Sequence, residues 1–187
     1  MNLLNHFEIN TLNNQGIEIL FEIFKRDFID NRTYLTNGTN SYQINVNETN
    51  VCPCPYGNGE KPEKFWHVIT RDKDNSQKSN NPCPDEHERK RVYDKARAKR
   101  IHWIKVIIDN WLSNNDIVFF YQTRGTRQNN LIIWHKKEKF IVIVRKISNT
   151  RTRYLVSSYI LHDSEEYRYE KQLKNYIKNS PTGEEWF

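Results

Sequence analysis

The sequence predicts an α+β protein: an antiparallel sheet of about four to six strands with helices packed on one side, and an N-terminal helical extension. Two patterns lead to this prediction. Residues 117–161 contain four runs rich in β-branched and aromatic side chains, joined by polar turns, as in an antiparallel meander. Other segments repeat their apolar residues at the helical spacing of three to four. Strand runs beside separate helices are typical of the α+β class.

The N-terminal part predicts a helix followed by a short strand. Residues 16–28 form an amphipathic helix, packed on the main domain or on a partner. Its apolar residues at helical spacing are Ile17, Leu20, Phe21, Phe24 and Phe28. The pair Asn37-Gly38 then marks a turn before a strand over residues 41–46.

The central part carries the first candidate functional residues. Residues 65–71, FWHVITR, predict a strand or strand edge that carries His67 and ends at Arg71. A lone histidine of this kind is more often structural than catalytic. Its ordinary pKa nevertheless suits a proton acceptor or donor near neutral pH.

Residues 89–111 predict one helix in which Arg97 and Arg100 lie on the apolar side, while Arg91 and Lys99 lie outside it. A buried guanidinium costs several kcal/mol unless it is paired or binds an anion. We therefore expect a cleft that binds phosphate. Two alternatives remain: the arginines reach the helix edge, or they pair with carboxylates. The candidate carboxylates are Asp72, Asp94 and Asp116.

The C-terminal part predicts four strands and a helix. The strands cover residues 117–122, 131–135, 140–147 and 154–161, and the helix covers 164–179 with Ser164 as N-cap. Alternation along the last strand places the hydroxyls of Ser157 and Tyr159 on one face. They are candidates for the site, although buried hydroxyls usually have local hydrogen bonds.

Basic side chains near the turns of the sheet are candidates for RNA contacts. Lys99 and the aromatic ring of Trp66 join them in the predicted RNA-binding set. The loop arginines are Arg124, Arg127, Arg151 and Arg153. Exposed arginines at one end of a sheet suit a phosphate backbone, although solvated turn residues are the commoner explanation.

Three cysteines do not make a disulfide framework. Cys52 and Cys54, with Cys83 and His87 in a second loop, have the ligand types of a structural zinc site, although the spacing is unusual. Free or buried thiols are the alternative. We expect no cofactor for catalysis and leave a structural zinc open.

Length and charge bound the organisation of the chain. Its 187 residues fit one domain with an extension, and we predict an accessory segment over residues 1–50 and one compact domain over residues 51–187. The net charge of +6 is uneven, because residues 1–50 carry three basic and six acidic side chains. The remaining segment is the expected polyanion binder. The sequence has neither a long apolar stretch nor a secretory signal, so we expect a cytoplasmic protein without a membrane partner.

Three stretches together resemble a known family. F-W-H-V-I-T-R, V-Y-D-K-A-R-A-K-R-I-H-W-I-K and Y-L-V-S-S-Y are similar to the phage-type branch of the barnase, EndoU, colicin and RelE-like (BECR) nucleases. The resemblance covers about residues 65–162. It implies a small α+β domain with an antiparallel sheet that cuts RNA without a metal. It also implies a toxin, with a cognate antitoxin or immunity protein as partner.

The resemblance assigns site residues one by one. The family's histidine matches His67, its basic residue after that segment matches Arg71, and its R-A-x-R-I run matches Arg97 and Arg100. Its strand-borne Thr or Ser matches Ser157. The family often has Thr-Ala-Tyr where this chain has Ser157-Ser158-Tyr159, which puts the role of the serine in doubt.

Metal-free RNA cleavage needs a base for the 2′-OH, donors for the charge on phosphorus oxygens, and an acid for the 5′-oxygen. The candidate residues supply these groups, so we predict a metal-independent endoribonuclease of a toxin–antitoxin or phage-defence system that leaves a 2′,3′-cyclic phosphate. One alternative is a non-catalytic RNA-binding module that stacks bases on Trp66, Trp103 and Tyr121. Another is a zinc-stapled interaction domain.

Overall fold

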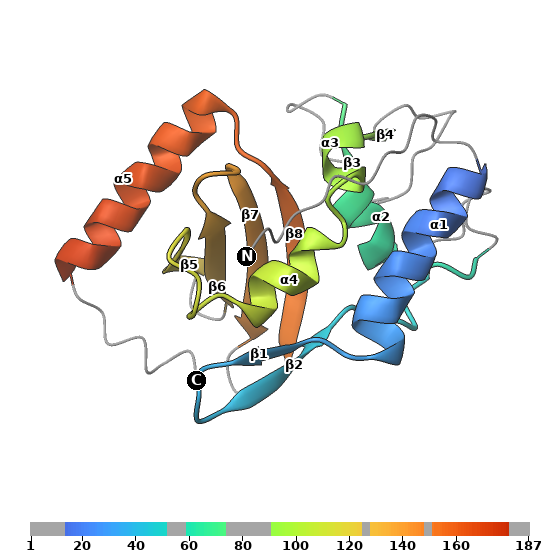
Figure 1. Ribbon diagram of the computed structural model, residues 1–187, viewed down its shortest axis with the longest axis horizontal. Helices are drawn as coiled ribbons and strands as arrows, with labels where there is room; N and C mark the ends of the chain where they lie inside the picture. The colour runs from blue at the N-terminus through green and yellow to red at the C-terminus, as the bar shows by residue number, and fades with distance from the viewer. Residues whose placement is uncertain (1–13, 52–58, 74–90, 125–127, 148–150, 180–187) are drawn as a thin grey trace. The chain divides into compact units, whose positions relative to one another are not determined.

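The computed structural model describes residues 14–51, 59–73, 91–124, 128–147 and 151–179 (Figure 1). The chain divides into two compact units, which we call the helical unit (residues 1–32 and 45–105) and the sheet unit (residues 33–44 and 106–187). This division does not coincide with the boundary predicted at residue 50, because the β1–β2 hairpin belongs to the sheet unit.

The elements, in order, are α1 (Asn14–Lys25), η1 (Arg26–Asp30), β1 (Tyr34–Thr36), β2 (Ser41–Asn45), α2 (Glu63–Ile69), β3 (Thr70–Asp72), β4 (Arg91–Tyr93), α3 (Lys95–Ala98), α4 (Trp103–Asp109), β5 (Ile117–Arg124), β6 (Gln128–His135), β7 (Phe140–Ile147), β8 (Arg153–Ile160) and α5 (Asp163–Asn179).

The sheet unit contains a mixed, six-stranded sheet in the order β1-β2-β8-β7-β6-β5. The four strands from β5 to β8 form the predicted antiparallel meander, and β1 pairs with β2 in a hairpin. The α+β class is thus confirmed. Between β7 and β8 the register shifts at Ile143 and Val144, which leaves Val156 as an extra residue in β8.

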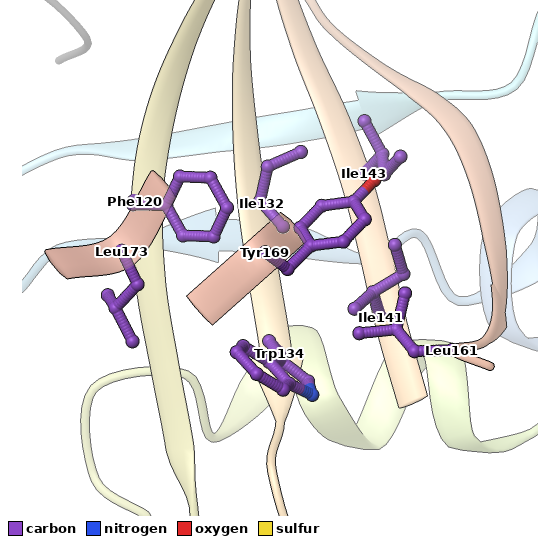
Figure 2. Packing of buried hydrophobic residues seen from close by; sticks show 8 residues of the cluster. All are labelled: Phe120, Ile132, Trp134, Ile141, Ile143, Leu161, Tyr169 and Leu173. Atoms are coloured by element: carbon purple, nitrogen blue, oxygen red, sulfur yellow. The ribbon is translucent and has the colours of Figure 1, made fainter. Parts of the chain in front are cut away.

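Helix α5 covers one face of the sheet. Its Tyr169 and Leu173 are buried over apolar side chains of the meander (Figure 2). The sheet residues in this cluster are Phe120, Ile132, Trp134, Ile141 and Ile143, with Leu161 beside them. The helix begins at Asp163, one residue before the predicted N-cap, and the backbone N–H of Glu166 donates to the carbonyl of His162.

The β1–β2 hairpin turns at the predicted Asn37-Gly38 pair. Gly38 has a φ of 88°, a conformation that glycine adopts without the strain a Cβ would bring. The side-chain oxygen of Asn37 accepts from the backbone N–H groups of Thr39 and Asn40, which closes the turn. The hairpin is also tied to residues after α4, since the indole N–H of Trp111 donates to the carbonyl of Thr36 at 2.8 Å.

The helical unit is built around aromatic side chains from two helices. Helix α1 and the π-helical turn η1 cover the predicted helix of residues 16–28, and Phe24 and Phe28 are fully buried. Phe65 of α2 lies with its ring centroid 5.3 Å from that of Phe21 and 5.7 Å from that of Phe24. Among the described helices, none has the length and apolar character needed to cross a membrane.

The strand predicted over residues 65–71 is wrong for most of its length, because residues 63–69 form helix α2. Its buried side chains are spaced as on one side of a helix: Phe65, Trp66, Val68 and Ile69. Only Thr70–Asp72 is extended, as β3, and it pairs with β4. His67 therefore lies in the last turn of a helix.

The single helix predicted over residues 89–111 is also wrong. Residues 91–93 are the strand β4, and Asp94 caps α3 by accepting from the backbone N–H groups of Ala96 and Arg97. Between α3 and α4 the backbone makes tighter turns, with N–H groups of Arg100 and Ile101 donating to carbonyls three residues back.

Candidate active site

His67 lies half-buried near the C-terminal end of α2. Its ring nitrogens make no hydrogen bond to any residue in the described part of the chain. Burial, and to a lesser extent the positive charges of Lys64, Arg91 and Arg97, together lower the pKa of this imidazole to about 3. At neutral pH the ring is therefore uncharged and available to accept a proton.

Two arginines satisfy the backbone where α2 ends. Arg97 donates to the carbonyl of Thr70 at 2.9 Å, and Arg91 donates to the same carbonyl at 3.1 Å and to the Thr70 hydroxyl at 3.0 Å. Carbonyls at a helix C-terminus carry partial negative charge, so cations stabilise this end. The arginines fix the turn that carries His67.

The carboxylate of Asp94 lies near both Arg97 and Arg71. Its carboxylate lies 3.2 Å from Nε of Arg97 and 3.9 Å from Nε of Arg71. The side chain of Arg97 is only 16% exposed, whereas that of Arg71 is 54% exposed. Pairing with Asp94, one of the sequence alternatives for Arg97, is thus confirmed. Arg71 is left as the accessible cation of the group.

A third carboxylate–guanidinium contact completes what we call the His67 cluster. Arg91 donates to the carboxylate of Asp72 at 2.8 Å across the β3–β4 pair. The cluster consists of His67, Lys64, Arg71, Arg91 and Arg97 with Asp72 and Asp94. Among the residues that the structure describes, the cluster holds four cations and two carboxylates, and this balance of charge favours an anionic ligand.

Arg100 is half-buried but has a local role. It donates to the carbonyl of Ala96 at 3.0 Å, and its guanidinium lies 4.8 Å from the centre of the Trp103 ring. Arg97 and Arg100, which the helical wheel placed on the apolar side, are both half-buried. Both guanidiniums hydrogen-bond backbone carbonyls of the helical unit.

Ser157 and Tyr159 belong to the sheet unit. They face the same side of β8, as predicted, because they pair with Ile143 and Ile141 on the face that α5 covers. The hydroxyl of Tyr159 lies 2.8 Å from that of Tyr169, and burial raises its pKa well above the ordinary value. Tyr159 is thereby part of the packing between β8 and α5.

Four of the six predicted RNA-binding residues have described side chains: Trp66, Lys99, Arg151 and Arg153. Lys99 is half-buried, and Arg151 is exposed beside the β1–β2 hairpin. Two expectations are wrong: Arg153 is 1% exposed and lies over the Tyr42 ring, and Trp66 is fully buried, so it offers no surface for a base. Trp103, from the alternative hypothesis, is fully buried too.

The other predicted residues are not placed. The side chain of Arg124 and the whole of Arg127 lie outside the described residues, as do the predicted zinc ligands. Those ligands are Cys52, Cys54, Cys83 and His87. A structural zinc therefore stays a prediction.

Sequence reasoning missed the roles of Arg91 and Lys64, and it missed Asp94 as the cap of α3. The helical wheel placed Arg91 outside the apolar arc, but its side chain is only 6% exposed. The available signal was Asp94, a good N-cap residue, because a helix that begins after Asp94 leaves residues 91–93 free to form a strand.

The low pKa of His67 predicts a pH-dependent stability. The folded pKa of about 3 lies below the unfolded value of 6.5, so between these values only the unfolded chain binds the proton. The free energy of unfolding should therefore fall as pH decreases from 6.5 toward 3. Between pH 7 and 4.5, the free energy of unfolding should fall by roughly 2 kcal/mol less in His67→Gln than in the parent, as measured by urea denaturation.

The matched control for this measurement is His162→Gln, which changes an exposed imidazole in the sheet unit. It should leave the pH dependence of the parent protein unchanged. Equal slopes for the parent and His67→Gln would show that His67 titrates alike in the folded and unfolded chain.

In comparisons with protein-family models, with curated proteins and with solved structures, the chain matches none of them.

Proposed function

We propose that this protein is a metal-independent endoribonuclease, the toxin of a toxin–antitoxin or phage-defence system, with its chemistry centred on the His67 cluster. The observation that carries the proposal is an uncharged imidazole whose pKa is lowered by three cations, Lys64, Arg91 and Arg97, with Arg71 joined to Arg97 through Asp94. Such a group accepts a proton while the surrounding charge attracts a phosphodiester. The resemblance of the sequence to BECR nucleases points to the same activity.

The proposed reaction is an attack of the ribose 2′-oxygen on the adjacent phosphorus. His67 accepts the 2′-OH proton as the new P–O bond forms, and the bond between phosphorus and the 5′-oxygen breaks. The 5′-oxygen leaves with a proton returned from the imidazolium, which gives a 2′,3′-cyclic phosphate and a 5′-OH. The reaction requires a 2′-OH, so DNA is not a substrate.

The arginines have different tasks in this proposal. Arg71, the most exposed of the three in the cluster, contacts the phosphate oxygens. Arg91 and Arg97 are held by Thr70 and by carboxylates, so they position the end of α2 and keep positive charge near His67. Ser157 and Tyr159 lie in the sheet unit, and the proposal does not depend on them.

A bound phosphate also prepares His67 as a base. A pKa of about 3 makes the free imidazole a weak proton acceptor. The negative charge of a phosphodiester offsets the cations that depress this pKa, so substrate binding raises it. The base thereby gains strength when RNA is in place.

The test is incubation of the purified protein with matched RNA and DNA oligonucleotides in EDTA. We expect cleavage of the RNA at full rate, because no metal takes part in the proposed reaction, and no cleavage of the DNA. Cleavage of DNA, or loss of activity in EDTA that returns with added metal, would contradict the proposal.

One observation weighs against catalysis and so leaves a second function, a non-catalytic RNA-binding module. Arg91 and Arg97 are engaged by internal partners, as in an ordinary structural network. This function requires RNA binding without any cleavage, and an affinity that His67→Ala leaves unchanged.

A further inference from the structure

A pocket of about 480 Å³ lies on the β1–β2 hairpin of the sheet unit. Its volume falls within the range of about 300–1,000 Å³ that is usual for small-ligand sites. The described residues that line it are Tyr34, Asn40, Ser41, Tyr42, Gln43 and Arg151. None of these is acidic, and all except Arg151 are neutral. The lining therefore suits a polar ligand with negative charge.

The hairpin register places an aromatic ring and an amide on the same side. Tyr34 pairs with Gln43 across the antiparallel hairpin, so their side chains share a face, and Ser41 lies on that face as well. The side chain of Tyr34 is not enclosed by the fold, because the residue is 45% exposed on the edge strand β1. A planar ligand can stack on this ring with an amide within its reach.

Arg151 is the arginine that lines the pocket. Arg151 is exposed and makes no ion pair with any residue in the described part of the chain. Arg153 is buried behind the hairpin, with its guanidinium 4.1 Å from the centre of the Tyr42 ring. The exposed guanidinium of Arg151 is thus the group that can contact an anion in the pocket.

We propose that this pocket binds one unstacked nucleotide of an RNA chain, with the base on Tyr34 and a phosphate on Arg151. Single-stranded RNA is recognised by stacking of splayed bases on aromatic side chains, with arginines at the backbone. The amides of Asn40 and Gln43 are suited to the polar edge of the base. The inference deepens the proposed function, since it rests on RNA being the substrate.

The test measures the affinity of a fluorescent oligonucleotide with 2′-O-methyl riboses, which 2′-OH attack cannot cleave. Tyr34→Ala and Arg151→Gln should each weaken binding about tenfold, the loss expected for one stacked base or one charged contact. Arg151→Gln should also reduce the salt dependence by about one phosphate contact. Tyr167→Ala and Arg168→Gln, an exposed tyrosine and arginine on α5, are the matched controls.

Unchanged affinity in the Tyr34 and Arg151 variants, or an equal loss in the controls, would overturn the pocket assignment. Binding of uridine or adenosine monophosphate without binding of the oligonucleotide would assign the pocket to a free nucleotide and overturn the RNA assignment. The two proposals fail separately. Tyr34-dependent binding without any cleavage refutes only the nuclease, whereas cleavage with unchanged affinity in both variants refutes only the pocket.

Discussion

His67→Ala is expected to lower the rate of RNA cleavage by about 10²–10⁴-fold, the usual contribution of a positioned acid–base group. The variant removes the proposed acceptor for the 2′-OH proton and leaves the cations of the cluster in place. The measurement is the single-turnover cleavage rate of a labelled oligoribonucleotide in EDTA, at saturating protein. Saturation separates the loss of chemistry from any loss of affinity.

The control for this experiment is His162→Ala, which removes an exposed imidazole of the sheet unit and should cleave as the parent does. RNA affinity and melting temperature of His67→Ala should stay close to those of the parent. Growth arrest on expression should depend on His67 as well, if the protein is a toxin. Full activity of purified His67→Ala would refute the assignment of the catalytic base.

Arg91→Met is expected to destabilise the helical unit by roughly 3 kcal/mol, because breaking a buried charge pair leaves its partners unsatisfied. The change removes three hydrogen bonds, to the hydroxyl and the carbonyl of Thr70 and to Asp72. Methionine fills similar space without a charge. Urea unfolding followed through amide signals of residues in α2 and β4 reports on this unit alone.

The neighbouring variant Arg71→Met is the control, since Arg71 lies on the paired strand but is 54% exposed. Its carboxylate contact is long, so the loss of stability should stay below about 1 kcal/mol. Equal effects of the two substitutions would show that the hydrogen bonds of Arg91 do not hold β3, β4 and α2 together.

The meander and the flanking helices could be predicted from sequence because their patterns are long and local. Residues 117–161 combine β-branched runs with short polar turns, and the structure has strands at all four places. Helix α5 is marked by acidic residues in its first turn and by Lys178 in its last. Each of these elements can be predicted from its own residues, because its pattern does not depend on contacts with distant parts of the chain.

The error at residues 63–69 shows the limit of composition. The run FWHVIT is aromatic and β-branched, which favours a strand, yet a short apolar run is ambiguous between strand and helix. The competing signal was Pro62 just before Glu63, typical of a helix start. Burial of Phe65 against Phe24 of α1, with the Trp66 ring packed on Phe65, then stabilises the helix despite the propensity for strand.

The error at residues 89–111 has a different cause. Ala98, Ile101, Ile104 and Ile107 are all buried, and their spacing of three fits the tight turns between α3 and α4 better than one regular helix. A helical wheel assumes the same rotation for every residue, so it does not detect a break between two helices. It still placed Arg97 and Arg100 toward the core.

The candidate site could be predicted only in part. His67, Arg71 and Arg97 of the predicted site lie in the helical unit, and Arg91 joins Arg97 at the Thr70 carbonyl through the pairing of β3 with β4. The carbonyl of Thr70, which joins Arg91 and Arg97, is a backbone group and has no sequence signal. Such contacts depend on tertiary structure.

The most direct test of His67-dependent RNA cleavage is the chemical identity of the new 3′ end. Phosphorus NMR or mass spectrometry of a short oligoribonucleotide, cut by the parent protein in EDTA, should show a 2′,3′-cyclic phosphate opposite a 5′-OH. The same reaction with His67→Ala should show none. A 3′-OH opposite a 5′-phosphate, or cyclic phosphate formed equally by the variant, would contradict 2′-OH attack assisted by His67.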